Sequence, residues 1–129
     1  MMLSVVTALI LGVAAQAASP IPAAPTGDSF LADAQALVDR GQGAENSAEA
    51  DQLRGQMGAA GSALRARVAA ETAAGKPPVA CLPAPGKASL NLGQIMSGIA
   101  ALTPAQRAGP FNDAFALALA SIYPCPAKP

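Results

Sequence analysis

The sequence predicts an all-α protein, a small bundle of four to five helices with one disulfide that follows an N-terminal signal peptide. Apolar residues recur at helical spacing in several segments, and no useful length alternates apolar and polar residues as a strand does. Glycine and proline clusters separate these segments. The mature chain has two cysteines, Cys81 and Cys125. An even pair in an exported protein favours a disulfide over two free thiols.

Residues 1–17 are typical of a secretory signal peptide. The run from Val5 to Ala15 is almost entirely apolar, and Ala15-Gln16-Ala17 has the small-x-small pattern of a signal peptidase site. A membrane anchor is the less favoured interpretation, because a span needs about 20 apolar residues. We therefore expect cleavage after Ala17, a periplasmic location and no membrane attachment afterwards. Residues 18–27 are rich in proline and are predicted to form a flexible leader.

Residues 28–129 are predicted to form one helical domain. Its first helix spans about 28–40, with Thr26 or Asp28 as the cap and Gly41 as the stop. Alanine accounts for 33 of the 129 residues, so we expect a core of thin side chains. The apolar face of this helix consists of Phe30, Leu31, Ala34, Leu37 and Val38.

A long second helix is predicted to begin at a capping box formed by Asn46 and Glu49 and to end near residue 74. Gly55, Gly58 and Gly61 lie inside it, and each costs up to about 1 kcal/mol relative to alanine. We expect another helix to approach closely at these glycines. A kink near Gly58, a dimer interface, and compositional drift toward alanine and glycine are the alternatives. The predicted core stripe is Leu53, Met57, Ala60, Leu64 and Val68.

Three helix starts are predicted in the C-terminal half. Asn91 and Gln94 form a capping box, Thr103 and Pro104 open a short helical turn, and Pro110 opens the last helix. Helices joined by a short connection run roughly antiparallel, so a bridge between the cysteines would tie both ends of this helical pair. On the chain-entropy model, such a bridge stabilises the fold by about 4 kcal/mol.

The composition disfavours several functions. The chain has no histidine and a formal net charge of zero, which disfavours catalytic triads, histidine-ligated metals and nucleic-acid binding. The aspartates Asp28, Asp33, Asp39 and Asp51 show no persuasive pairing for acid–base chemistry. We therefore expect a protein that is not an enzyme and that has no catalytic residue, cofactor or metal.

Four motifs stand out between the two cysteines: Cys81-Leu82-Pro83, Leu92-Gly93-Gln94-Ile95, Thr103-Pro104, and the alanine- and leucine-rich stretch 114–125 that ends in Ile-Tyr-Pro-Cys. In these motifs, the segment from Cys81 to Cys125 resembles the Rap/Tai family of immunity proteins. Residues 57–64 are similar to the glycine-bearing second helix of the family. The chain lacks the cysteine pair that forms the first disulfide of that family.

The resemblance implies a small, exported helical protein that neutralises type VI secretion effectors, among them peptidoglycan amidases, and that is often dimeric. We therefore expect a secreted effector hydrolase as the partner, and a homodimer as a further option. A periplasmic protein of structural or chaperone-like role, without an effector, is the alternative. The partner-binding candidates are Pro83 and Pro85 before the third helix, and Thr103 and Pro104 in the short turn. Proline in these segments would reduce the conformational entropy lost when a partner binds. The alternative interpretation is that the prolines only stiffen the loops.

Overall fold

The computed structural model describes residues 24–87 and 89–126. The predicted signal peptide, residues 1–17, and most of the predicted leader lie outside these residues. Within the described part, every regular element is helical, and the only β-type pairing is an isolated bridge between Thr26 and Pro110. The prediction of an all-α fold of four to five helices with one disulfide is confirmed.

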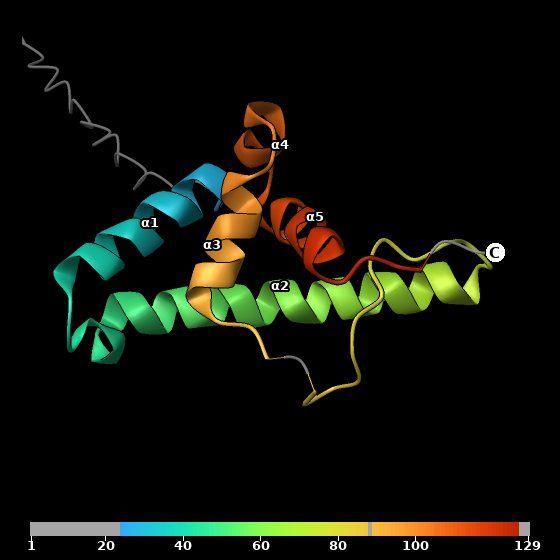
Figure 1. Ribbon diagram of the computed structural model, residues 1–129, viewed down its shortest axis with the longest axis horizontal. Helices are drawn as coiled ribbons and strands as arrows, with labels where there is room; N and C mark the ends of the chain where they lie inside the picture. The colour runs from blue at the N-terminus through green and yellow to red at the C-terminus, as the bar shows by residue number, and fades with distance from the viewer. Residues whose placement is uncertain (1–23, 88, 127–129) are drawn as a thin grey trace, which may run out of the picture.

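The longest helix, α2, runs the length of the molecule, and α1, α3 and α5 lie on one side of it with α4 beyond them (Figure 1). A short 3-10 turn, η1, connects α1 to α2. Among the described residues, no helix combines the length and the apolar character that crossing a bilayer requires. The bounds are α1 Gly27–Arg40, η1 Ala44–Asn46, α2 Ala48–Ala73, α3 Leu92–Ala100, α4 Pro104–Ala108 and α5 Phe111–Ile122.

Three helices begin with the reciprocal hydrogen bonds of a capping box, as expected from short polar side chains at helix starts. Of the two caps considered for the first helix, the structure uses Thr26, whose Oγ1 accepts a 3.0 Å hydrogen bond from the N–H of Ser29. The predicted caps Asn91 and Thr103 are also confirmed. Local sequence therefore determines where α1, α3 and α4 begin.

The predicted start of the second helix was wrong by one residue. Asn46 is the last residue of η1, and its N–H donates to the carbonyl of Gly43. Ser47 caps α2 instead and accepts from the N–H of Ala50. Gly43 has a φ of 88°, a left-handed conformation that glycine adopts readily and that starts this extra turn.

The last residues of the predicted leader, 25–27, pair with the chain that precedes α5. The carbonyl of Pro25 accepts a 2.9 Å hydrogen bond from the N–H of Phe111, and the N–H of Gly27 donates to the carbonyl of Gly109. Gly109 and Phe111 are more than 80 residues away in sequence, so local patterns did not indicate this pairing.

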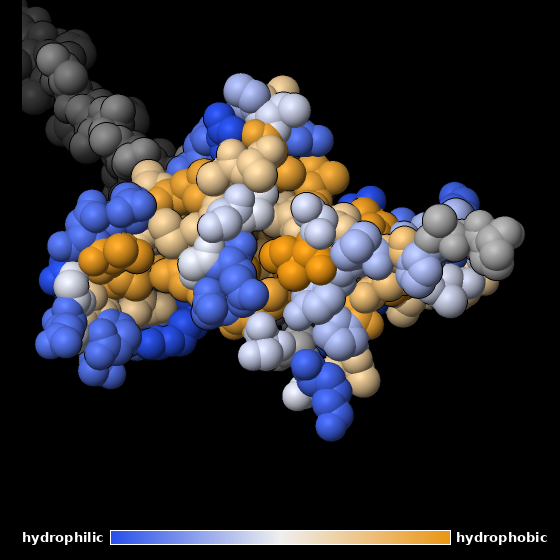
Figure 2. All heavy atoms as spheres, viewed as in Figure 1, coloured by the Kyte–Doolittle hydropathy of each residue, from blue (hydrophilic) through white to orange (hydrophobic). Residues whose placement is uncertain are grey.

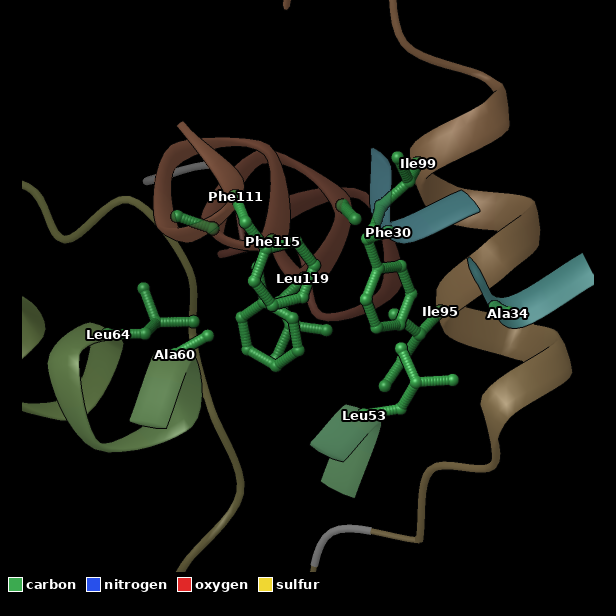
Figure 3. Packing of buried hydrophobic residues seen from close by; sticks show 12 residues of the cluster. Phe30, Ala34, Leu53, Ala60, Leu64, Ile95, Ile99, Phe111, Phe115 and Leu119 are labelled. Atoms are coloured by element: carbon green, nitrogen blue, oxygen red, sulfur yellow. The ribbon is translucent and has the colours of Figure 1, made fainter. Parts of the chain in front are cut away.

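The core lies where α1, α2, α3 and α5 meet (Figure 3). Its largest fully buried side chains are Phe30, Ile99 and Phe111, and many of the remaining buried positions are alanine. Small side chains allow the helices to approach closely, as expected from the composition. The labelled cluster consists of Phe30, Ala34, Leu53, Ala60, Leu64, Ile95, Ile99, Phe111, Phe115 and Leu119.

The glycines of α2 do not line a helix–helix contact, so that expectation was wrong. A Cβ atom built on Gly55, Gly58 or Gly61 would meet nothing within 4 Å. A three-residue step falls about 60° short of a full turn, so the glycines drift off the core stripe of this helix. The close approaches lie elsewhere: a Cβ atom on Gly27 would lie 2.8 Å from the carbonyl oxygen of Arg107, and one on Gly98 would lie 3.0 Å from the Cβ of Ala118. α2 continues from Ala48 to Ala73 as one helix through Gly58.

Candidate functional site

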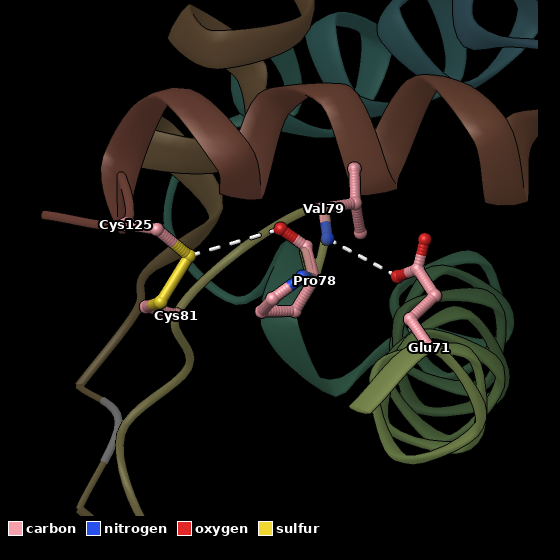
Figure 4. Close-up of a disulfide and its surroundings, with 5 residues drawn as sticks. All are labelled: Glu71, Pro78, Val79, Cys81 and Cys125. Carbon is pink, nitrogen blue, oxygen red and sulfur yellow. Dashed lines mark hydrogen bonds between the residues drawn. A yellow bond between two sulfur atoms is a disulfide. The ribbon is translucent and has the colours of Figure 1, made fainter. Parts of the chain in front are cut away.

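The predicted disulfide between Cys81 and Cys125 is present, with an S–S distance of 2.09 Å and a Cα–Cα distance of 4.8 Å (Figure 4). The N–H of Cys81 also donates a 3.0 Å hydrogen bond to the carbonyl of Tyr123. The covalent bond and the hydrogen bond hold the chain that leads into α3 against the end of α5. The disulfide therefore ties together the two ends of the C-terminal helical region, as the sequence predicted.

The segment around Cys81 is also attached to the C-terminal part of α2. The carboxylate of Glu71 accepts a 3.1 Å hydrogen bond from the N–H of Val79 (Figure 4) and lies 3.6 Å from the Nε of Arg67. Ala80 is fully buried, and the side chains of Val79 and Leu82 pack against the core. The segment 79–82 is thus held by α2 and by the end of α5 before the chain reaches Pro83.

A short turn follows this fixed segment. We call residues 83–87 the proline turn. The carbonyl of Pro83 accepts a 3.4 Å hydrogen bond from Arg65, and the N–H of Lys87 donates to the carbonyl of Ala84. Gly86 has a φ of 82°, which closes the turn in a left-handed conformation. Pro83 is half-buried and Pro85 is exposed, so the turn has an anchored base and a free tip.

The second pair of candidates, Thr103 and Pro104, opens α4. The hydroxyl of Thr103 is already used, because it accepts from the N–H of Gln106 at the start of this helix. Pro104 occupies the first helical position and is exposed. Arg107 fixes α4 to its neighbours by bonding to Asp28 and to the carbonyl of Leu102. Thr103 therefore has a structural role at the start of the helix.

The two candidate segments do not form one surface. In Figure 1, the proline turn projects from the lower edge of the molecule beyond α2, whereas α4 lies at the opposite, upper edge. A partner that contacts Pro85 would need to reach across the whole bundle to contact Pro104. The sequence could not indicate this separation, because it depends on how the helices pack.

One hollow lies beside the disulfide, and another lies between two helices away from the candidate residues. The first, of about 480 Å³, is lined by Cys81, Cys125 and residues 75–78. The other is a shallow groove of about 530 Å³ lined by residues of α1 and α3, among them Leu31 and Met96. Figure 2 shows apolar residues at the surface in the region of these two helices. Sequence reasoning missed this groove. Leu31 and Met96 belong to the apolar faces predicted for their helices, and the sequence did not indicate that these side chains stay only partly buried.

The acidic side chains are mostly engaged with neighbours. Asp28 lies 3.2 Å from Arg107, Asp51 lies 2.7 Å from Arg54, and Asp39 accepts a 2.8 Å hydrogen bond from Gln35. Residues 24–87 and 89–126 contain no group of three or more histidine, cysteine, aspartate or glutamate side chains that could hold a metal ion.

The pKa of the Glu49 carboxyl is lowered from its usual value. The free backbone N–H of Glu49 at the start of α2 lowers the pKa of its carboxyl, and the hydrogen bond and charge of Arg40 lower this pKa further. The Glu49 carboxylate lies 3.1 Å from the guanidinium of Arg40. Both causes stabilise the charged form, so the shift reflects a helix start and an exposed ion pair.

Comparison with known proteins identifies no relative: no family model, curated protein or solved structure matches the chain significantly. Family membership and function are therefore proposals. They rest on the residues of the segment from Cys81 to Cys125 and on the geometry described above.

Proposed function

We propose that this chain is a periplasmic immunity-type protein of the Rap/Tai kind, which binds and neutralises a secreted effector such as a peptidoglycan amidase. The observation that carries the proposal is the proline turn, a projecting tip whose base is held by the Cys81–Cys125 disulfide and by α2. The Cys-Leu-Pro pattern at the base of this turn is also where the resemblance to the family begins.

A rigid, projecting turn can inhibit a hydrolase without any catalytic group. A tip that enters the substrate cleft excludes substrate, and a few anchor side chains supply most of the binding free energy. Anchoring of the turn in the free protein reduces the conformational entropy lost on binding. Pro85, Gly86 and Lys87 are exposed at this tip, and we assign the contact to them. Thr103 and Pro104 lie on the other side of the molecule and are not part of this contact.

The proposed compartment agrees with the chemistry of the chain. A disulfide persists in oxidising environments such as the bacterial periplasm. The signal peptide expected at residues 1–17 would deliver the chain there. Peptidoglycan lies in the same compartment, so an effector that cleaves it would act where this protein is present.

Inhibition assays test the proposal. The purified protein is titrated into peptidoglycan amidase effectors from the same species, beginning with any that is encoded beside it. We expect inhibition that is complete near one equivalent, and protection of cells that express the effector in their own periplasm. Pro85→Arg combined with Lys87→Glu should weaken inhibition at least tenfold. The matched control is Ala105→Arg on α4, which is also exposed and should leave inhibition unchanged.

Two outcomes would count against this function. If no effector is inhibited and no cell is protected, the immunity role is wrong. If Ala105→Arg weakens inhibition and the tip variant does not, the proline turn is the wrong surface. Circular dichroism of each variant establishes that it is folded before binding is compared.

The alternative is a periplasmic helical protein with a structural or chaperone-like role and no effector. The open apolar groove between Leu31 and Met96 favours this alternative, because it is a surface that could bind unfolded chains or a second copy. Such a protein would suppress aggregation of an unfolded test protein and would inhibit no amidase. Sedimentation analysis of the purified chain measures whether it forms the homodimer expected from the resemblance.

A further inference from the structure

We propose that the Cys81–Cys125 disulfide is a site of thiol–disulfide exchange on the folded protein, opened by a dithiol reductant that attacks the Sγ of Cys81. This inference does not depend on an effector. It means that the covalent bond at the base of the proline turn opens when the surrounding compartment becomes reducing.

The two cysteine residues differ in exposure. Cys81 is exposed, whereas Cys125 is half-buried. The disulfide forms part of the wall of a hollow of about 480 Å³, whose other lining residues are Gly75, Lys76, Pro77, Pro78 and Pro126. A nucleophile must approach the attacked sulfur directly, and access decides which disulfides react in the native state. Both cysteines line this hollow, and Cys81 is the more exposed of the two, so we assign the attack to it.

The exchange balances as two displacements. A thiolate of the dithiol attacks the Sγ of Cys81, the bond between the two protein sulfurs breaks, and Cys125 leaves as a thiolate that takes a proton from water. The second thiol of the reductant, once deprotonated, then attacks the mixed disulfide and releases Cys81. Overall, the dithiol becomes a disulfide by losing two electrons, and the protein gains two thiols.

After the bond breaks, the thiol of Cys125 has a hydrogen-bond acceptor nearby. The Sγ of Cys125 lies 3.8 Å from the carbonyl oxygen of Pro78 (Figure 4), so a protonated thiol there could donate to this oxygen. The hydrogen bonds from Cys81 to Tyr123 and from Val79 to Glu71 do not involve sulfur. These hydrogen bonds would hold residues 79–81 against α2 and α5 while the disulfide opens. The exchange therefore does not require the helices to separate.

Reduction kinetics test the inference. The oxidised protein is treated with dithiothreitol at increasing urea concentrations below the unfolding transition, and free thiols are trapped with iodoacetamide and counted by mass. We expect a rate that is first order in dithiothreitol, independent of urea in this range, and within about tenfold of the rate for the unfolded chain. A rate that rises with urea in parallel with the unfolded population would overturn the proposal.

A core variant makes the test independent of urea. Ile99 is fully buried in α3, and Ile99→Val should raise the unfolded population about two- to tenfold while the fold is kept. We expect its reduction rate to equal that of the parent. A rate that rises by the same factor as the unfolded population would show that the disulfide opens only through unfolding.

The position of attack provides a second readout. Brief treatment with glutathione, an acid quench and peptide mapping locate the mixed disulfide. We expect the adduct on Cys81 to exceed that on Cys125 at least fivefold at the earliest times. Equal adducts, or an excess on Cys125, would contradict the assignment of Cys81 as the attacked residue.

Discussion

Phe30 of α1 stacks on Phe111, the first residue of α5, with ring centroids 4.4 Å apart and an angle of 21° between the ring planes. Both side chains are buried, and Phe115 lies against Phe111 with centroids 5.7 Å apart. The N–H of Phe111 also donates to the carbonyl of Pro25. This pair therefore joins the N-terminal helix to the C-terminal helical region by side-chain and backbone contacts together.

Phe30→Ala should lower the free energy of unfolding by about 3–5 kcal/mol, because it leaves a cavity in a core that otherwise consists largely of small side chains. Phe111→Ala should have a similar effect. In a double-mutant cycle, the two changes should couple by about 0.5–1.5 kcal/mol, as stacked aromatic pairs do. Urea denaturation followed by circular dichroism measures these values. Strictly additive effects would mean that the stacking itself contributes nothing.

Cys81→Ser and Cys125→Ser should each lower the melting temperature strongly under oxidising conditions. Loss of the cross-link lets the unfolded chain gain conformational entropy equivalent to about 4 kcal/mol for a loop of this length. With excess reductant present, the parent should melt close to the two variants. If parent and variants melt at the same temperature without reductant, the disulfide does not stabilise the fold.

Glycine-to-alanine substitutions should affect stability differently where a new Cβ has free space and where it meets neighbouring atoms. Gly58→Ala should raise stability by about 0.5–1 kcal/mol, since the new Cβ meets nothing within 4 Å and alanine favours the helix. Gly27→Ala should lower it by about 1–3 kcal/mol, because its Cβ would lie 2.8 Å from a backbone oxygen. Thermal melts measure both. A loss of dimer on Gly58→Ala would instead place a second copy on that face of α2.

Arg107→Ala should destabilise the protein by about 1–2 kcal/mol. This side chain is 26% exposed, and it bonds to Asp28 of α1 and to the carbonyls of Ala100 and Leu102 at the end of α3. Arg40→Ala is the matched control. It should leave the unfolding midpoint nearly unchanged, since Arg40 pairs with Glu49 in solvent. Similar effects of the two changes would refute the assignment of Arg107 as the link between α1, α3 and α4.

The carboxyl of Glu49 should titrate below its usual pKa of 4.5. Because folding lowers this pKa, the stabilising effect is present above the unfolded pKa and is lost as pH falls through the folded one. Arg40→Gln should raise the pKa only part of the way, since the largest cause, the backbone N–H of Glu49, remains. Carboxyl NMR titration measures both values. Full restoration to 4.5 in the variant would mean that Arg40 is the sole cause.

Features determined by neighbours in sequence were predictable. The caps at Thr26, Asn91 and Thr103 depend on one side chain and the residue three positions later. The stop at Gly41 and the core stripe of α2 depend on spacing within one helix. The second helix was placed one residue early because the 3-10 turn at η1 engages Asn46, and propensity alone does not distinguish it from Ser47 as the cap.

By itself, the sequence determined that the chain is helical, where most helices begin and end, and that two cysteines form a disulfide. Those properties follow from hydrogen bonds and spacing within a few residues, or from the presence of one even pair of cysteines. Tertiary packing alone decided that the glycines of α2 face open space, that Pro25 pairs with Phe111, and that Pro85 and Pro104 lie on opposite sides. Each of these depends on the angle at which helices cross, which is set by side chains distant in sequence filling one core together.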